Sequence, residues 1–198
     1  MKKEAIYSIA FTRRLQGTAW VFGDNVDADW DICNLHDLRE RAEEGVLPAD
    51  EELAKRCLAG LNPQFPLRVQ KGDFIVAGIN TGCSAACLDG LPGDPHLYAL
   101  APLALKSAGI AAVLCESAAT NFQRNSIDLG LPVVECKGIK DMVQEGHVLE
   151  VNLATGTVRN LDNGAEIRFT PFPGLILEIL DAGGIHAYMD RKKSAQKT

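Results

Sequence analysis

Short apolar runs separated by helix-like segments constrain the fold more than any other feature of this sequence. They are Ala19 to Phe22, "GDFIVAGI" (72–79), "IAAVLCE" (110–116) and "LPVVECK" (131–137). Runs of this length, bounded by glycine, proline or charged residues, are typical of buried strands. Strands that alternate with helices pair in parallel through right-handed crossovers. The sequence therefore predicts an α/β fold with a parallel sheet flanked by helices.

The segments around these runs carry the start and end signals of helices. Charged residues alternate with apolar ones at helical spacing, and glycines stand where C-caps belong. Three helices are predicted: 51–60, capped by Asp50; 101–108, ended by Gly109; and a third from a Ser117 cap to Gly130.

The last third of the chain changes character. Between residues 147 and 173, apolar and polar residues alternate around Thr155-Gly156 and Asn163-Gly164, which are turn dipeptides of antiparallel hairpins. The remaining pattern predicts a short helix over 174–184, a strand over 185–189 and a flexible tail over 190–198. We expect a single domain over residues 1–198, because a chain of this length can bury one sizeable core.

Charge and composition exclude several classes of partner. The formal net charge is −6, and the basic residues cluster only near the C-terminus, which argues against nucleic acid. The apolar stretch near the N-terminus is too short for a signal sequence or a membrane span, so we expect no membrane association and a cytoplasmic location. Six cysteines without a C-x-x-C pair are expected to be free thiols there.

Four stretches carry a family resemblance. They are "GDNVDADWDI", "DEELAKRCLAGLNPQFPLRVQKGDFIVAGINTGC", "LAPLALKSAGIAAVLCESAATNFQRNSIDLGLPVVEC" and "TGTVRNLDNGAEIRFTPFPGLILEILDAGGI". In this order, over about residues 17–189, they resemble the small subunit of 3-isopropylmalate dehydratase, the swivelling domain of the aconitase superfamily. The resemblance implies a swivelling β/β/α domain.

The resemblance also implies a hydro-lyase. In that family a separate large subunit carries a [4Fe-4S] cluster, so this chain itself would bind no cofactor. Iron acts as a Lewis acid on the hydroxy acid substrate, a serine of the small subunit abstracts a proton, and a neighbouring arginine holds a carboxylate. The implied partners are the large iron–sulfur subunit and a small hydroxy acid, and an isolated chain could form a homo-oligomer through its partner-facing surface. The family serves leucine biosynthesis, but the substrate of this chain stays open.

The loop "NTGCSAACLDGLPGDPHLYALAP" (80–102) departs from the family motif GCGSSREHAP. Read without a gap, residues 84–87 take the places of Gly, Ser, Ser and Arg. Anchored instead on residues 101–102, the SSRE positions fall at 96–99 after an insertion. The serine pair and the arginine are absent under either alignment, which predicts an altered substrate specificity.

Three interpretations of this loop compete. In the first, the loop is an altered active site in which one side chain transfers the proton, the candidates being Ser84, Cys83, Cys87, Asp89 and His96. In the second, the loop is a surface of a non-catalytic assembly or regulatory subunit. In the third, Cys83 and Cys87 form a redox or metal pair, although no histidine or third thiol stands nearby in the sequence. The candidate catalytic residues are Ser84, Cys83 and His96, and the candidate substrate-binding residues are Asn80, Gly82, Asp29 and Arg124.

A second loop, "DNVDADWDIC", keeps Asp24, Asn25 and Asp29 of a family pattern. Asp29 either orients backbone at the cleft or accepts hydrogen bonds from turn amides. Asp27 and Asp31 add negative charge, which favours a ligand less acidic than a tricarboxylate.

Overall fold

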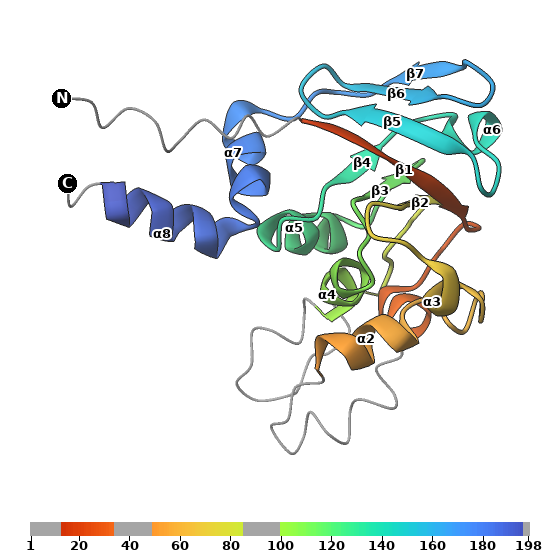
Figure 1. The fold of residues 1–198 in the computed structure, drawn as a ribbon, viewed down its shortest axis with the longest axis horizontal. Coiled ribbons are helices and arrows are strands. Elements are labelled where there is room, and N and C mark those ends of the chain that lie inside the picture. The colour runs from red at the N-terminus through yellow and green to blue at the C-terminus, as the bar shows by residue number, and fades with distance from the viewer. Residues whose placement is uncertain (1–12, 34–48, 85–99, 196–198) are drawn as a thin grey trace.

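The computed structural model describes residues 13–33, 49–84 and 100–195, and within them a seven-stranded sheet forms the centre of the fold (Figure 1). The strand order is β4-β3-β2-β1-β5-β6-β7. Strands β1 to β4 pair in parallel, whereas β1 with β5, β5 with β6, and β6 with β7 pair antiparallel. The bounds are β1 Arg14–Val21, β2 Phe74–Ala77, β3 Ala112–Cys115, β4 Val133–Glu135, β5 Val148–Asn152, β6 Thr157–Asn160 and β7 Glu166–Arg168.

Helices connect and cover these strands. In chain order they are the π-helix η1 Ala28–Ile32, α2 Asp50–Arg56, α3 Phe65–Arg68, α4 Leu100–Ser107, α5 Thr120–Asp128, α6 Ile139–Met142, α7 Gly174–Ala182 and α8 Ile185–Ala195. The predicted α/β fold, with a parallel sheet flanked by helices and antiparallel hairpins in the C-terminal third, is confirmed.

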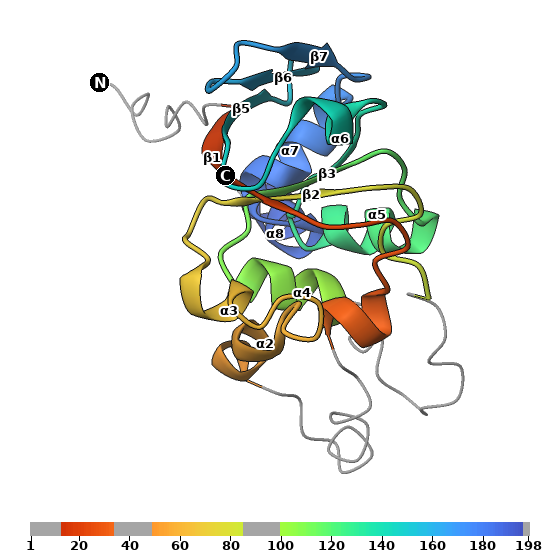
Figure 2. The ribbon, with the colours of Figure 1, turned by 90° about the vertical axis from the view of Figure 1, so that its right-hand side faces the viewer.

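Each face of the sheet buries its own apolar cluster, because successive side chains of a strand point to opposite faces. On one face, Ile75 of β2 and its neighbours pack against α2 to α5, and the Phe65 ring meets the Trp20 ring edge to face at 5.1 Å. On the other face, Phe74 packs with the hairpin strands and with Leu177 of α7. Figure 2 shows α2, α3 and α4 together on one side of β1 to β3. The sheet therefore serves as the rigid base for the loops at its edges.

Two helix starts differ from the prediction. The N-cap residue of α2 is Ala49 rather than the predicted Asp50, and no side chain caps this helix. Helix α2 also ends at Arg56 rather than at residue 60. Ser117 does not cap α5, because its Oγ accepts a hydrogen bond from the Asn80 amide across the loops. A long-range partner thus replaces the local one that the sequence suggested.

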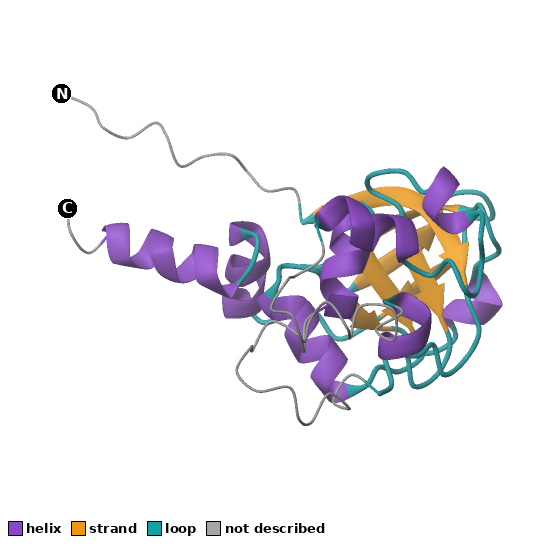
Figure 3. Ribbon diagram, turned by 90° about the horizontal axis from the view of Figure 1, so that it is seen from below, coloured by secondary structure: helices purple, strands orange, loops and turns teal. Residues whose placement is uncertain are grey.

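The predicted strand over 185–189 is wrong, because helix α8 covers Ile185–Ala195, which includes the first residues of the predicted tail. Gly183 and Gly184 have φ of 91° and 129°, and the Tyr188 amide then bonds to the Gly184 carbonyl to begin α8. No residue of α8 is fully buried, so these residues do not form a buried strand. Helix α8 projects from the body (Figures 1 and 3). No helix in the described part of the chain is long and apolar enough to cross a membrane.

Candidate functional site

The carboxyl ends of the parallel strands β1 to β4 meet at one edge of the sheet. Open α/β sheets bind their ligands in the crevice outside this edge. The loops that leave it are 22–27, 78–84, 116–119 and 136–138. Most of the candidate residues from the sequence lie on the first two of these loops or directly after them.

Parallel pairing continues past the ends of β1 and β2 and holds these two loops in register. Asp27 and Cys83 form an isolated parallel bridge, with the Ala28 amide 2.8 Å from the Cys83 carbonyl oxygen. The Gly82 amide lies 2.8 Å from the Val26 carbonyl oxygen. Backbone bonds of this kind fix relative positions more firmly than side-chain contacts, so residue 84 is held beside residue 27.

Asp27 lies at the centre of the polar groups in these two loops. One carboxylate oxygen, Oδ1, accepts the amides of Asp29 at 2.8 Å and Trp30 at 3.0 Å, which caps η1. The other oxygen, Oδ2, accepts the Ser84 hydroxyl at 2.6 Å. The Cys83 thiol lies 3.9 Å from that same oxygen. The carboxylate therefore links the start of η1 to both a hydroxyl and a thiol.

Burial, and then the charge of Asp27, raise the pKa values of two neighbouring groups. Partial burial and then the Asp27 carboxylate raise the pKa of Asp29 from 3.8 to about 6. Burial and then Asp27 also raise the pKa of the Cys83 thiol above its ordinary value of 9.0. Cys83 is therefore a neutral thiol near pH 7, which donates rather than accepts a proton.

Two asparagines and a serine in these loops adopt the left-handed backbone conformation. Asn25, Asn80 and Ser84 have φ of 56°, 57° and 64°. Asn80 donates from Nδ2 to Asn25 Oδ1 at 3.0 Å, and its amide donates to Ser117 Oγ at 2.9 Å. Such backbone conformations are uncommon outside glycine, asparagine and aspartate, and they gather at functional sites when the surrounding structure holds them.

Gly78 and Gly82 allow the loop after β2 to pack this closely. A Cβ on Gly82 would lie 2.1 Å from the Phe122 ring, and a Cβ on Gly78 would lie 1.6 Å from Asp24 Oδ1. The missing side chain at Gly78 leaves room for Asp24 Oδ1 to accept the Ile79 amide at 3.2 Å. Both glycines are thus required by packing.

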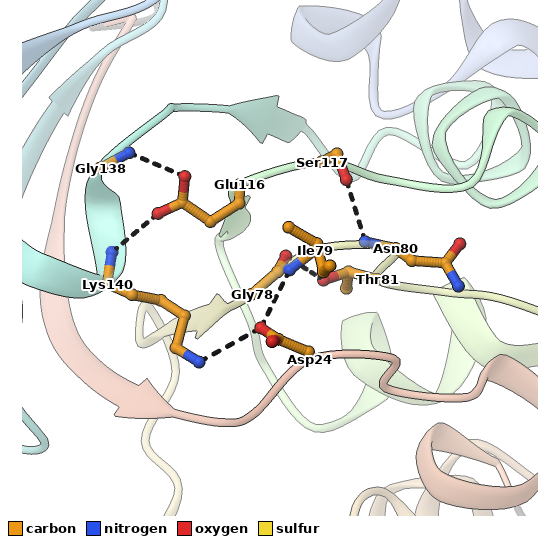
Figure 4. A network of polar contacts seen from close by, with 9 residues as sticks. All are labelled: Asp24, Gly78, Ile79, Asn80, Thr81, Glu116, Ser117, Gly138 and Lys140. Carbon is orange, nitrogen blue, oxygen red and sulfur yellow. Dashed lines mark hydrogen bonds and ion pairs between the residues drawn. The ribbon is translucent and has the colours of Figure 1, made fainter.

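A second polar network ties the ends of β3 and β4 to the same edge (Figure 4). Glu116 accepts the amides of Gly138 at 2.8 Å and Lys140 at 3.2 Å through its two carboxylate oxygens. The Lys140 ammonium reaches back to Asp24 at 3.3 Å. These contacts connect the loops that follow β1 and β3 to the start of α6.

The structure brings part of the predicted site together. One loop holds four of the candidate residues, namely Asn80, Gly82, Cys83 and Ser84. Asp29 was considered as an acceptor for turn amides, but the side chain that accepts these amides is that of Asp27. Arg124 lies exposed on α5. His96, Cys87 and Asp89 lie outside the described residues.

Sequence reasoning missed the central place of Asp27 and the contact of Lys140 with the edge. An aspartate directly before a helical turn is a known capping signal and could have pointed to Asp27. Nothing local could have pointed to Lys140, whose partner is distant in sequence.

A groove of about 540 Å³ adjoins the second network. It lies between β4 and residues 168–172, and its lining includes Glu116, Glu135, Lys137 and Arg168. The candidate catalytic residues Ser84 and Cys83 are not among its lining residues. Within the described residues, no group of three or more His, Cys, Asp or Glu side chains could hold a metal ion.

Curated proteins and a solved structure resemble this chain over most of its length. The 3-isopropylmalate dehydratase small subunit 1 of Methanopyrus kandleri is 42% identical over 178 residues, which are 90% of this chain and 94% of that protein. The isopropylmalate/citramalate isomerase small subunit of Methanocaldococcus jannaschii is 40% identical over 185 residues, covering 90% and 95%. The crystal structure of 3-isopropylmalate dehydratase from the latter organism superposes with a TM-score of 0.77 at 33% identity, covering 93% of this chain and 98% of that one. No protein-family model matches the chain.

Proposed function

Because the chain belongs to the family of 3-isopropylmalate dehydratase small subunits, we propose that it is the small subunit of a hydro-lyase acting on a hydroxy acid of the isopropylmalate or citramalate kind. Its partner is a separate large subunit. The observation that carries the catalytic part of this proposal is the 2.6 Å hydrogen bond from the Ser84 hydroxyl to Asp27 at the carboxyl edge of the sheet.

The iron–sulfur cluster implied by the family resemblance belongs to the large subunit in this proposal. When bound, it supplies a Lewis acid for the substrate hydroxyl. Within the described residues, no three or more His, Cys, Asp or Glu side chains stand close enough together to hold it. The role of this chain is therefore to position the substrate and move a proton.

Ser84 is the proton-transfer residue in this proposal and replaces the serine missing from the family motif. It lies at the edge where ligands of such sheets bind, and its hydroxyl is oriented by a carboxylate. The neutral Cys83 thiol is the weaker candidate for a base. His96 is the alternative that mutagenesis must separate from Ser84.

The charges at this edge support an altered substrate specificity. Asp24, Asp27, Asp29 and Glu116 contribute carboxylates, and Lys140 is already paired with Asp24. The arginine that clamps a substrate carboxylate in the family has no counterpart at the motif position. We expect the large subunit to hold most of the substrate's carboxylate charge, which favours a substrate with few carboxylates facing this chain.

The test uses the complex isolated with its native large subunit under anaerobic conditions, assayed on isopropylmalate and citramalate. Ser84→Ala should lower kcat by about 10²- to 10⁴-fold, the range for loss of a general base. Ser107→Ala, at the end of α4 on the opposite edge of the sheet, should change it less than twofold.

Three other results would count against this assignment. A loss of activity in His96→Ala but not in Ser84→Ala would assign the base to His96. A complex with no activity on any hydroxy acid would identify a non-catalytic assembly subunit. Isolation of this chain only as a homo-oligomer would contradict the partnership.

A further inference from the structure

We propose that Asp27 is the proton acceptor behind Ser84, so that the two residues form a serine–carboxylate relay. This inference rests on the proposed function and deepens it, because it names the group that receives the serine proton. The family motif provides no such partner for residue 84, since a glycine occupies that position under the ungapped alignment.

The geometry of Asp27 suits this role because its carboxylate is fixed in orientation. The amides of Asp29 and Trp30 both bond to Oδ1, which leaves Oδ2 turned toward Ser84. The amide of Asp27 itself donates to Asp31 Oδ2 at 2.8 Å, so the backbone is held as well. A carboxylate gripped by several donors does not swing away during a reaction, and this preorganisation is what proton transfer requires.

The Ser84 hydroxyl is oriented in the sense that a relay needs. At 2.6 Å the bond falls in the range of O–H···O⁻ hydrogen bonds, in which an ionised carboxylate only accepts. The serine proton therefore points toward Asp27 Oδ2, and the two lone pairs of Oγ remain for a proton from the substrate. The left-handed backbone at Ser84, with φ of 64°, is an unfavourable conformation for a serine and places the side chain there.

Other carboxylates at this edge have different tasks. Asp24 accepts the Ile79 amide and pairs with Lys140, and Glu116 accepts two amides at the start of α6. Among the described carboxylates, Asp27 is thus the one with a hydroxyl on one oxygen and structural amides on the other.

The proposed step balances as follows for dehydration. The substrate carbon loses a proton to Ser84 Oγ while the Ser84 hydroxyl proton passes to Asp27 Oδ2. The bonding pair of the broken C–H bond forms the new C=C bond, and the substrate hydroxyl leaves with its own bonding pair as hydroxide. Asp27 ends as a neutral carboxyl and returns the proton through Ser84 in the hydration direction.

The decisive variant is Asp27→Asn in the native complex, assayed under the same anaerobic conditions. Asparagine is as good an N-cap as aspartate, and its side-chain oxygen still accepts amides, but it takes up no proton. We expect kcat to fall by 10²- to 10⁴-fold while KM changes less than threefold. The double variant with Ser84→Ala should be no slower than Ser84→Ala alone, because residues that act as one unit are non-additive.

Matched controls separate the relay from a structural role. Asp162→Asn removes a carboxylate that accepts the Val148 amide in the antiparallel half of the sheet, and it should leave kcat within twofold. If Asp27→Asn is poorly folded, Asp27→Ser takes its place, because it also keeps a capping side chain without a carboxylate and should show the same fall in kcat. A fall in kcat on Ser84→Ala without one on either Asp27 variant would overturn the relay and leave the proposed function standing. No effect of Ser84→Ala would remove the serine base and the relay together.

Discussion

The parallel and antiparallel halves of the sheet share the strand β1 but differ in how their loops are supported. In the parallel half, loops that follow β1, β2 and β3 bond to one another through Asn25, Asn80 and Ser117. In the antiparallel half, β6 and β7 are joined by a short turn around Asn163-Gly164, and a Cβ on Gly164 would meet no atom within 4 Å. Hairpin strands are neighbours in sequence and need only a local turn, whereas parallel strands are joined by crossovers, so their loops are positioned by long-range contacts.

The largest expected effect compares one glycine from each half. Gly82 and Gly164 have nearly equal φ of 74° and 73°, so an alanine suffers the same backbone penalty of about 1–2 kcal/mol at both. Gly82→Ala also drives a Cβ into the buried Phe122 ring, which should bring its total loss of unfolding free energy to about 3–4 kcal/mol. Urea denaturation of both variants measures the difference. Equal losses would show that the loop after β2 is no more tightly packed than the hairpin.

A smaller, pH-dependent effect is expected at Asp29 on the parallel side. Its folded pKa of about 6 lies above the ordinary 3.8, so the folded chain binds a proton more readily than the unfolded one. The ionised carboxylate therefore lowers stability, a loss that develops as the pH rises from about 4 to 6 and is complete by pH 7. Asp29→Asn should raise the unfolding free energy by about 1 kcal/mol at pH 7, after allowance for its partial exposure to solvent, and by close to nothing below pH 4.

Denaturation of the wild type and this variant between pH 4 and 8 gives the check. A gain that does not change with pH would mean that Asp29 acts through its hydrogen bonds rather than through its charge.

The smallest effect concerns an ion pair in each half. Lys140→Met removes the pair with Asp24, and Arg168→Met removes the looser 3.9 Å contact with Glu166. Partly exposed pairs contribute about 0.2–1 kcal/mol, so Lys140→Met should cost about 0.5 kcal/mol and Arg168→Met close to zero. Repeating the denaturation in 1 M salt should reduce the difference, because the charges are screened. A larger loss of unfolding free energy in Arg168→Met than in Lys140→Met would contradict the view that the tighter ion pair lies at the carboxyl edge.

The sequence by itself determined the strands of the parallel sheet, the hairpins and most of the longer helices, in their order along the chain. The apolar runs over 72–79, 110–116 and 131–137 contain β2, β3 and β4, and the dipeptides Thr155-Gly156 and Asn163-Gly164 marked the hairpin turns. Both signals depend only on residues that are close in sequence. It also identified the family and the loop that holds Ser84.

Tertiary structure decided which side chains meet. The Ser84 bond to Asp27 joins residues 57 positions apart, and Ser117 bonds to Asn80 instead of capping its own helix. The sequence prediction also failed at 185–189, where a strand was expected but the residues form the start of α8. Local patterns report what a segment prefers, while hydrogen bonds between distant segments depend on the register of the whole sheet, which only the folded chain sets.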